Sequence, residues 1–174
     1  MKKLLLSLSI VVLFLSISSA NALNIAFIET DAIIEKSTAM KKAKDQILEQ
    51  RKNYQEELSV EEEDLQKKIK KLEKQRSKFT KDTLDKKEKK LSQEITELNQ
   101  LLQTRNETLR KVEIKVMTQI GKKMEEILKD VKEKEKIDLI FADKQVILYN
   151  KDMDISDKVL KRLNKELPTV KVRF

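Results

Sequence analysis

Residues 91–116, LSQEITELNQLLQTRNETLRKVEIKV, decide the fold of this chain. Apolar side chains recur in this stretch at alternating steps of four and three, with a single polar interruption. The positions are Leu91, Ile95, Leu98, Leu102, Arg105, Leu109, Val112 and Val116. This spacing places one apolar stripe along an α-helix, as in the seam of a coiled coil. We therefore predict a long helix that packs against a second helix.

The stripe changes character after residue 116. It drifts to Ile120, Met124, Ile127 and Val131. Such a drift indicates that the helix leaves a two-helix contact and enters a broader one.

A second apolar stripe precedes the first and predicts the partner helix. It consists of Met40, Ile47 and Tyr54 at intervals of seven, interleaved with Leu58, Leu65 and Leu72. The pattern predicts a helix over about residues 37–76, although Arg51 and Glu61 fall on stripe positions. Two such helices would form an antiparallel hairpin of about 60 Å, because roughly 40 residues rise 1.5 Å each.

Residues 77–85 separate the two stripes, and their Thr80, Asp82 and Thr83 favour a turn followed by a helix start. The positive charge of the chain gathers around this turn. Residues 67–90 hold twelve Lys and Arg against four Asp and Glu, a net +8. The whole chain holds 38 against 30, which is also +8. The turn would therefore be the basic tip of the hairpin.

The N-terminus predicts export. Lys2 and Lys3 precede an apolar stretch over residues 4–15, and Ala20-Asn21-Ala22 offers a small–x–small cleavage site. We predict a signal peptide over residues 1–22 and a mature chain of net charge +6, without Lys2 and Lys3. A retained membrane anchor is the alternative, but serines interrupt the apolar stretch, and a span needs about 20 apolar residues.

The basic tip allows three interpretations. It can be a solvated end without a partner, a nucleic-acid patch, or a surface that attracts anions. Export and the shortage of aromatic residues for base stacking exclude nucleic acid as the expected partner. We favour attraction of acidic unfolded chains or anionic lipid headgroups. Phe79 can either plug the end of the hairpin or contact a partner. The candidate contact residues are Lys78, Phe79, Lys81, Lys86 and Lys87.

Composition argues against enzyme chemistry. The chain has no His and no Cys, so the commonest general base, metal ligand and thiol nucleophile are missing. The acidic run at residues 61–64 is most simply a solvated helix face, because successive helix positions point in different directions. We predict a non-enzyme without catalytic residues, cofactor or metal.

Glycine and proline are nearly absent, with one residue of each, and 39% of residues are charged. This profile is typical of long helices or coiled coils. Intrinsic disorder is the alternative for so charged a chain, but the periodic apolar stripes oppose it. The one glycine, Gly121, lies within the second helical pattern, where it is either tolerated or marks a close helix crossing.

Three short apolar runs bracket the hairpin, at residues 25–28, 137–142 and 146–149. The polar residues between the last two runs predict a β-hairpin. Apart from Asp138, each run is apolar at consecutive positions, so both faces of the sheet require burial, and one hairpin root cannot cover both. Open sheet edges would also remain. We therefore predict that copies of the chain join through this body. The predicted oligomerisation residues are Ile25, Phe27, Leu139, Ile140, Phe141, Val146 and Leu148.

The C-terminal region predicts one further helix. Asp154, Ser156 and Asp157 offer caps, Val159, Leu160 and Leu163 form an apolar face, and Pro168 would end the helix. The last residues alternate Val170, Val172 and Phe174, and we favour a frayed terminus over an added strand.

The predicted fold is mainly α with a small β body. A long antiparallel helical hairpin, a coiled-coil prong, projects from a strand-rich oligomerisation body. Residues 23–174 would form a single domain. Its body comes from residues 23–38 and 120–174, its prong from about 39–119, and its tip from about 77–85.

The order of these parts resembles the Skp/OmpH family of periplasmic chaperones of Gram-negative bacteria. The resemblance covers nearly all of the mature chain: the opening NIAFI (24–28), the charged hairpin and a closing block. That block reads IDLIFAD (137–143), VILY (146–149) and DISDKVLKRLN (154–164). Residues 166–174 run past it.

The resemblance implies a periplasmic homotrimer whose β-rich body carries three helical prongs around a cavity. It also implies ATP-independent holding of unfolded outer-membrane proteins. The family's contacts with lipopolysaccharide match no residue pattern here, so the basic tip is only a candidate for an anionic lipid or lipopolysaccharide surface. The alternative function is an exported coiled-coil spacer or scaffold with one defined partner.

Overall fold

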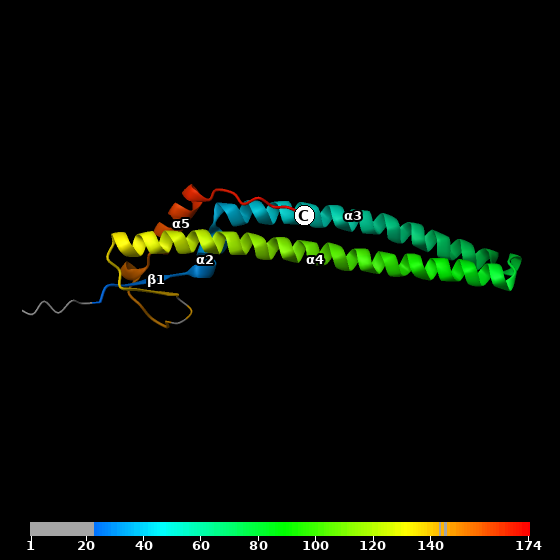
Figure 1. Ribbon diagram of the computed structural model, residues 1–174, viewed down its shortest axis with the longest axis horizontal. Helices are drawn as coiled ribbons and strands as arrows, with labels where there is room; N and C mark the ends of the chain where they lie inside the picture. Colours follow the sequence, from blue (N-terminus) through cyan, green and yellow to red (C-terminus); the bar gives the residue numbers. More distant parts are fainter. Residues whose placement is uncertain (1–22, 143, 145) are drawn as a thin grey trace, which may run out of the picture.

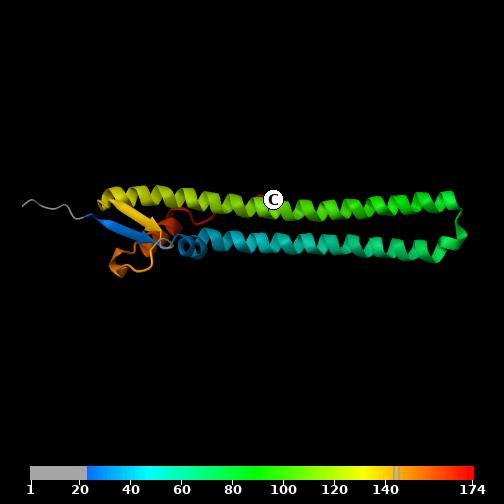
Figure 2. The ribbon, with the colours of Figure 1, turned by 90° about the horizontal axis from the view of Figure 1, so that it is seen from below.

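The computed structural model describes residues 23–142, 144 and 146–174. The predicted signal peptide and residues 143 and 145 of the predicted β-turn lie outside them. The elements are β1 (Ile25–Ile28), α2 (Thr30–Lys36), α3 (Thr38–Gln75), the 3-10 helix η2 (Arg76–Lys78), α4 (Lys81–Lys134), β2 (Leu139–Ala142), the 3-10 helix η4 (Lys151–Met153) and α5 (Ser156–Glu166). α3 and α4 form a long antiparallel hairpin that projects from a small body (Figure 1 and Figure 2). The predicted fold class is confirmed.

Polar side chains start both long helices. The Ser37 hydroxyl accepts a hydrogen bond from the Met40 amide at 3.1 Å, and the Thr80 hydroxyl accepts one from the Thr83 amide at 3.4 Å. Each bond satisfies an amide that the first helical turn leaves unpaired. The connection is shorter than predicted, because Thr80 caps α4 directly and residues 81–85 already belong to the helix.

The hairpin seam has a buried half near the body and a half-exposed half near the tip. The last buried side chains on the way to the tip are Leu58 and Leu109, and residues 59–108 contain none. Ile95 and Leu102 of the predicted stripe are exposed. Only two helices meet in this half, so side chains at the margin of the seam keep one side open to water. The predicted drift near the body is confirmed by the burial of Ile120, Met124, Ile127 and Val131.

The two arginines that interrupt the stripes are paired across the hairpin. The guanidinium of Arg105 lies 4.4 Å from the centre of the Tyr54 ring. Its Nη2 donates to both carboxylate oxygens of Glu57, at 3.0 and 3.1 Å. Arg51 likewise donates to Glu113 at 3.2 Å. Each charge is neutralised by the opposite helix, so the interruptions do not break the seam.

β1 and β2 form a two-stranded parallel sheet in which Phe27 pairs with Phe141. Successive side chains of a strand point to opposite faces. Ala26 and Ile28 belong to the hydrophobic core, whereas Leu139 and Phe141 remain 45% and 36% exposed. The helices of the chain therefore cover one face of the sheet, and the other face points outward.

The predicted β-hairpin of residues 137–142 with 146–149 is wrong. Residues 146–149 form no strand, and β2 pairs in parallel with β1. The other edge of β1 is occupied by the start of α5, where the Ile155 amide donates to the Phe27 carbonyl at 3.0 Å. Tyr149 instead stacks on Phe27, with 4.4 Å between ring centres. Packing of the Tyr149 ring thus buries part of an apolar run that has the composition of a strand.

α5 joins the body to the root of the hairpin. Val159 and Leu163 on its apolar face are fully buried, as predicted. The Asn164 side chain accepts a hydrogen bond from the Thr38 amide at 2.7 Å, in the first turn of α3. The helix ends at Glu166, before Pro168.

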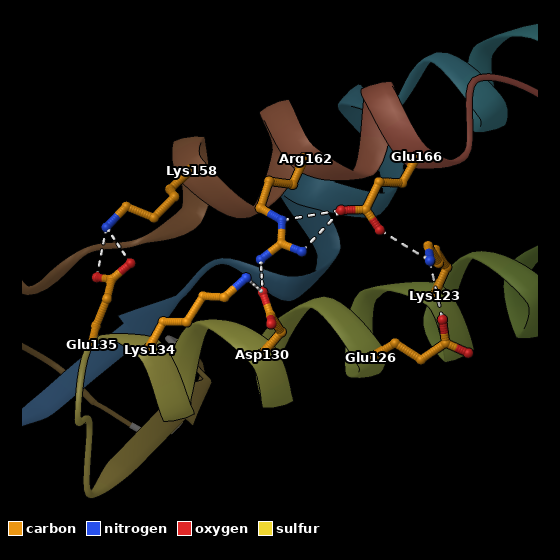
Figure 3. A network of polar contacts seen from close by, with 8 residues as sticks. All are labelled: Lys123, Glu126, Asp130, Lys134, Glu135, Lys158, Arg162 and Glu166. Atoms are coloured by element: carbon orange, nitrogen blue, oxygen red, sulfur yellow. Dashed lines mark hydrogen bonds and ion pairs between the residues drawn. The ribbon is translucent and has the colours of Figure 1, made fainter.

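A network of ion pairs fixes α5 on α4 (Figure 3). Arg162 lies at its centre and binds Asp130 of α4 as well as Glu166, the latter at 2.9 Å. Glu166 also binds Lys123 of α4 at 3.0 Å. The residues of this network are Lys123, Glu126, Asp130, Lys134, Glu135, Lys158, Arg162 and Glu166. Most of these side chains are solvated, so salt should weaken their interactions.

The C-terminal tail, residues 167–174, packs against the hairpin, so the expected frayed terminus is wrong. Val170 is only 4% exposed and belongs to the hydrophobic core, and Leu167 and Val172 pack against that core. The tail runs from α5 along the root of the hairpin in the direction of the tip (Figure 1). It forms no strand.

Candidate functional site

The basic tip is exposed and incompletely neutralised. Of the cations in residues 67–90, Lys67, Lys68, Arg76 and Lys86 form ion pairs. In the described part of the chain no carboxylate lies within 4.0 Å of the exposed Lys70, Lys71, Lys74, Lys78, Lys81, Lys89 and Lys90. The end of the hairpin therefore presents positive charge to solvent.

Phe79 lies at the end of the hairpin. Its ring is half-buried, and the Lys87 ammonium lies 5.0 Å from the ring centre. A cation over an aromatic face is attracted by the negative charge of that face. Phe79 is thus partly packed at the end of the hairpin and partly accessible in the cleft described below.

The five predicted contact residues differ in their availability. Lys78 and Lys81 are exposed and have no ion pair within the described residues. Lys86 pairs with Asp82 at 2.7 Å, and Lys87 covers Phe79. Lys78 and Lys81 are thus the most accessible cations of the predicted set.

A shallow cleft lies between α3 and α4 just below the tip. Its lining consists of Lys68, Lys71, Leu72, Gln75, Phe79, Lys87, Lys90, Leu91 and Glu94. Its only carboxylate, Glu94, pairs with Lys68 at 2.9 Å. Hydrogen bonds, first to Asp64 and then to Glu94, raise the pKa of Lys68. The cleft combines ammonium groups with an apolar floor, which suits a ligand that is both acidic and apolar.

Of the lysines of this cleft, sequence reasoning named Lys87 and missed Lys68, Lys71 and Lys90, because they come from two helices. Lys68 and Lys71 lie on the outgoing helix, and Lys90 on the returning one. Their positions next to the stripe residues Leu72 and Leu91 are the signal that could have identified them.

The structure separates the predicted oligomerisation residues into three groups. Ile140 packs against the hydrophobic core, and Phe27 is buried beneath Phe141 and Tyr149. Ile25 and Val146 are half-buried, while Leu139, Phe141 and Leu148 are exposed. Leu148 is 88% exposed, and Ile147, which the prediction omitted, is 97% exposed. The outward side of the body is therefore an apolar surface with nothing over it within the described chain.

Apolar side chains also remain exposed along the hairpin. They are Leu48, Val60, Ile95, Leu102, Ile114 and Met117. A groove near the root is lined by Ile34, Met40, Ile47, Leu48, Val116 and Met117, with charged residues at its rim. Sequence reasoning missed this groove, because Leu48 and Met117 lie off the stripes. Ile114 and Met117 are three residues apart and lie beside stripe residue Val116, and this spacing was the available signal for apolar surface next to the stripe.

The described residues hold no group of carboxylates that could bind a metal ion. In the same residues, no helix has the length and apolar character that crossing a bilayer requires.

Comparisons with known proteins give a family and a similar fold. The profile of the family described as "Outer membrane protein (OmpH-like)" matches residues 24–163. A candidate outer membrane chaperone (OmpH-like) from Caulobacter crescentus CB15 has a similar crystal structure, with a TM-score of 0.80 and 18% identity. The similarity covers 90% of this chain and 94% of that one. No curated protein sequence matches this chain.

Proposed function

This chain belongs to the OmpH-like family of outer membrane proteins, and from this premise we propose that it is an ATP-independent holdase for unfolded outer-membrane proteins. A chaperone role is what the family supports. The observation that carries the finer proposal is the set of apolar side chains left exposed along a highly charged hairpin. A holdase binds many sequences weakly, so it requires dispersed apolar contacts and no catalytic group.

Dispersed contacts are sufficient for useful affinity. Burying one large apolar side chain contributes about 1.5–3 kcal/mol, and a flexible client covers only part of each. Once one segment is bound, the remaining segments of the same client are at high effective concentration. Leu48, Ile114 and Met117 near the root, with Ile95 and Leu102 further out, would supply such contacts to one client.

Assembly into a homotrimer would enclose the client. The outward face of the sheet, with Leu139 and Phe141, and the exposed Leu148 supply apolar surface for contacts between copies. Within the described residues β2 pairs only with β1, so its other edge is open. We propose that residues 23–38 and 120–174 form the assembly body and that residues 39–119 form a prong. Three prongs would surround a cavity.

The basic tip would increase the rate of client capture. Exposed cations such as Lys78 and Lys81 attract acidic segments, and the attraction extends over a Debye length of about 8 Å at physiological ionic strength. An anionic lipid or lipopolysaccharide surface offers the same chemistry and is a second proposed partner. Nucleic acid is not a proposed partner.

We place the protein in the periplasm, after removal of residues 1–22. N-terminal sequencing of the exported protein tests this placement, and the first residue should lie at or next to Leu23. An N-terminus at Met1 in a membrane fraction would instead support a retained anchor.

Light scattering tests the holding activity. An unfolded outer-membrane β-barrel protein is diluted from urea in the presence of the chain, without nucleotide. The wild-type chain should suppress the rise in scattering. A variant with Leu48→Gln, Ile114→Gln and Met117→Gln should suppress it less, because these exposed side chains support client binding more than folding. As a matched control, Gln substitutions at the exposed polar Lys52, Asn106 and Thr118 should change nothing.

A coiled-coil spacer or scaffold with one defined partner is the alternative function. Such a protein would leave aggregation of the β-barrel client unaffected in this assay. The exposed apolar side chains favour the holdase, because a spacer does not require exposed apolar side chains along its length.

A further inference from the structure

The C-terminal tail extends past the family match, which ends at residue 163, and occupies a groove on α4. The groove is formed on α4 by Val112, Lys115, Val116 and Gln119, and the tail residues Thr169, Val170, Lys171 and Arg173 lie along it. Val112 and Val116 are buried seam residues. The tail therefore covers apolar surface of the hairpin, on the side of the seam away from Leu48 and Met117.

The tail meets the groove with alternate side chains. Val170 is buried and Val172 half-buried, whereas Lys171 and Arg173 between and after them are exposed. Alternation with period two is the pattern of an extended strand. It is also the pattern of a strand in an outer-membrane β-barrel, where apolar and polar side chains alternate along segments of about ten residues.

The tail is held almost entirely by apolar packing. Beyond the Leu167 amide, which donates to the Leu163 carbonyl at 2.8 Å, no hydrogen bond or ion pair joins the tail to any described residue. Val170 is its only buried side chain. The groove on α4 contributes one cation, Lys115, the tail adds Lys171 and Arg173, and neither side contributes a carboxylate. Like charges on tail and groove repel, so an extended segment with acidic residues at the same alternate positions would fit better.

We propose that this groove on α4 is a binding site for extended segments that alternate apolar with acidic residues, and that the tail fills it when no such segment is present. Such a segment would displace the tail, place its apolar side chains where Val170 and Val172 lie, and pair its carboxylates with Lys115. The identification of this segment with a strand of a β-barrel client rests on the proposed function. The existence of the groove and its occupation by a displaceable tail do not depend on the proposed function.

Peptide binding to a chain truncated after Pro168 tests the site. Three fluorescent peptides of residues 166–174 are compared by anisotropy at low salt: the natural sequence, one with Lys171→Glu and Arg173→Glu, and one with Val170→Asp. The truncated chain should bind the natural peptide, bind the acidic peptide severalfold more tightly, and fail to bind the Val170→Asp peptide. The full chain should bind the acidic peptide about tenfold more weakly, as for a site that is free one-tenth of the time. Equal binding by the two chains, or binding by neither, overturns the proposal.

Two controls protect this test. The truncated chain retains Leu163 and Leu167, and circular dichroism should show wild-type helicity. If it does not, the full chain with Val172→Asp replaces it, because that change loosens the tail without removing it. Phe174→Ala is the matched control, since Phe174 is exposed, and it should bind peptide as the full chain does.

The client assay separates this proposal from the proposed function. If the full chain suppresses aggregation but no peptide binds, the proposed holdase function is supported and the proposed binding site in the groove is wrong. If the peptides bind the truncated chain but no client is held, the proposed binding site is supported and its assignment to strands of β-barrel clients is wrong.

Discussion

Arg105 lies with its guanidinium over the ring of Tyr54, 4.4 Å from the ring centre, where the hairpin seam changes from buried to half-exposed. Tyr54 belongs to the hydrophobic core. The Nη2 of Arg105 binds Glu57, while its Nε is buried without a hydrogen-bond partner among the described residues. The contact marks the outer end of the well-packed half of the hairpin. The packing free energy of the hairpin should therefore come mainly from its root, and substitutions in the tip half should cost less stability.

Truncating a seam residue should cost much more in the root than near the tip. Tyr54→Ala removes a buried ring and should lower the free energy of unfolding by about 3 kcal/mol. Leu65→Ala lies at a half-exposed position of the same stripe and should cost clearly less. Urea unfolding followed by circular dichroism at one protein concentration gives both values. Equal losses would show that the tip half packs as tightly as the root.

Replacing the single glycine should stabilise the chain. A Cβ at Gly121 would meet no atom of the described residues within 4 Å, so among these residues the glycine is tolerated and marks no close helix crossing. Gly121→Ala should raise the free energy of unfolding by about 1 kcal/mol, the difference in helix propensity. Thermal unfolding measures the gain. A loss of stability would indicate a contact at this position, for example with another copy of the chain.

The ion pairs that hold α5 should make stability depend on pH in the acid range. Hydrogen bonds from Lys134 and Arg162 lower the pKa of Asp130 below its ordinary 3.8. Hydrogen bonds from Lys123 and Arg162 lower the pKa of Glu166 below its ordinary 4.5. A carboxylate whose pKa is lowered on folding stabilises the fold above its ordinary pKa, and this contribution is lost as pH falls through the folded value.

The variant Arg162→Met tests this dependence, because it keeps the aliphatic stem and removes the charge. Its deficit in melting temperature against wild type should be largest above pH 4.5 and shrink toward zero as the carboxylates protonate. Added salt should shrink it as well. Lys52→Met, which removes only an exposed pair with Glu56 within α3, serves as control. A deficit that stays constant down to the acid limit would mean that Arg162 acts through packing alone.

Most of the helical architecture could be predicted from the sequence, because two long stripes with 3–4 spacing leave few alternatives. The body could be predicted only in part. Residues 25–28 and 139–142 form strands as predicted. Tyr149, however, packs by stacking its ring on Phe27 and does not pair its backbone in a sheet. Helix α2 is too short for its apolar residues to show a helical repeat in the sequence. The packing of Val170 depends on a groove whose residues lie more than 50 positions earlier. The cleft that Phe79 lines likewise combines residues of two helices, and the only local signal for it was the position of its lysines beside Leu72 and Leu91.

Two charge insertions in β2 should have different consequences, because its side chains alternate between core and outside. Ile140→Asp would bury an unpaired charge against the core, which costs several kcal/mol, and should unfold the chain. Leu139→Asp, on the outward face, should leave a folded chain that no longer assembles. Circular dichroism and mass by light scattering separate the two results. A Leu139→Asp variant with wild-type mass would place the assembly surface elsewhere, such as around Leu148.

Reversing the charge at the tip should slow client capture. Lys78, Lys81, Lys86 and Lys87 changed to Glu should leave helicity and mass unchanged, since all four are exposed. Client association at low salt should slow and lose most of its salt dependence, whereas dissociation, set by apolar contacts, should change less. The control reverses four exposed lysines near the body, Lys41, Lys42, Lys132 and Lys161. If both variants slow capture equally, overall charge matters and the tip has no special role.

The mass of the complex between the chain and one unfolded outer-membrane protein tests the central claim most directly. Size-exclusion chromatography with light scattering, without nucleotide, should show a soluble species that contains one client and three copies of this chain. The client in it should remain unfolded by circular dichroism. A chain that elutes alone as a monomer while the client precipitates would contradict the account, because neither assembly nor holding would then occur.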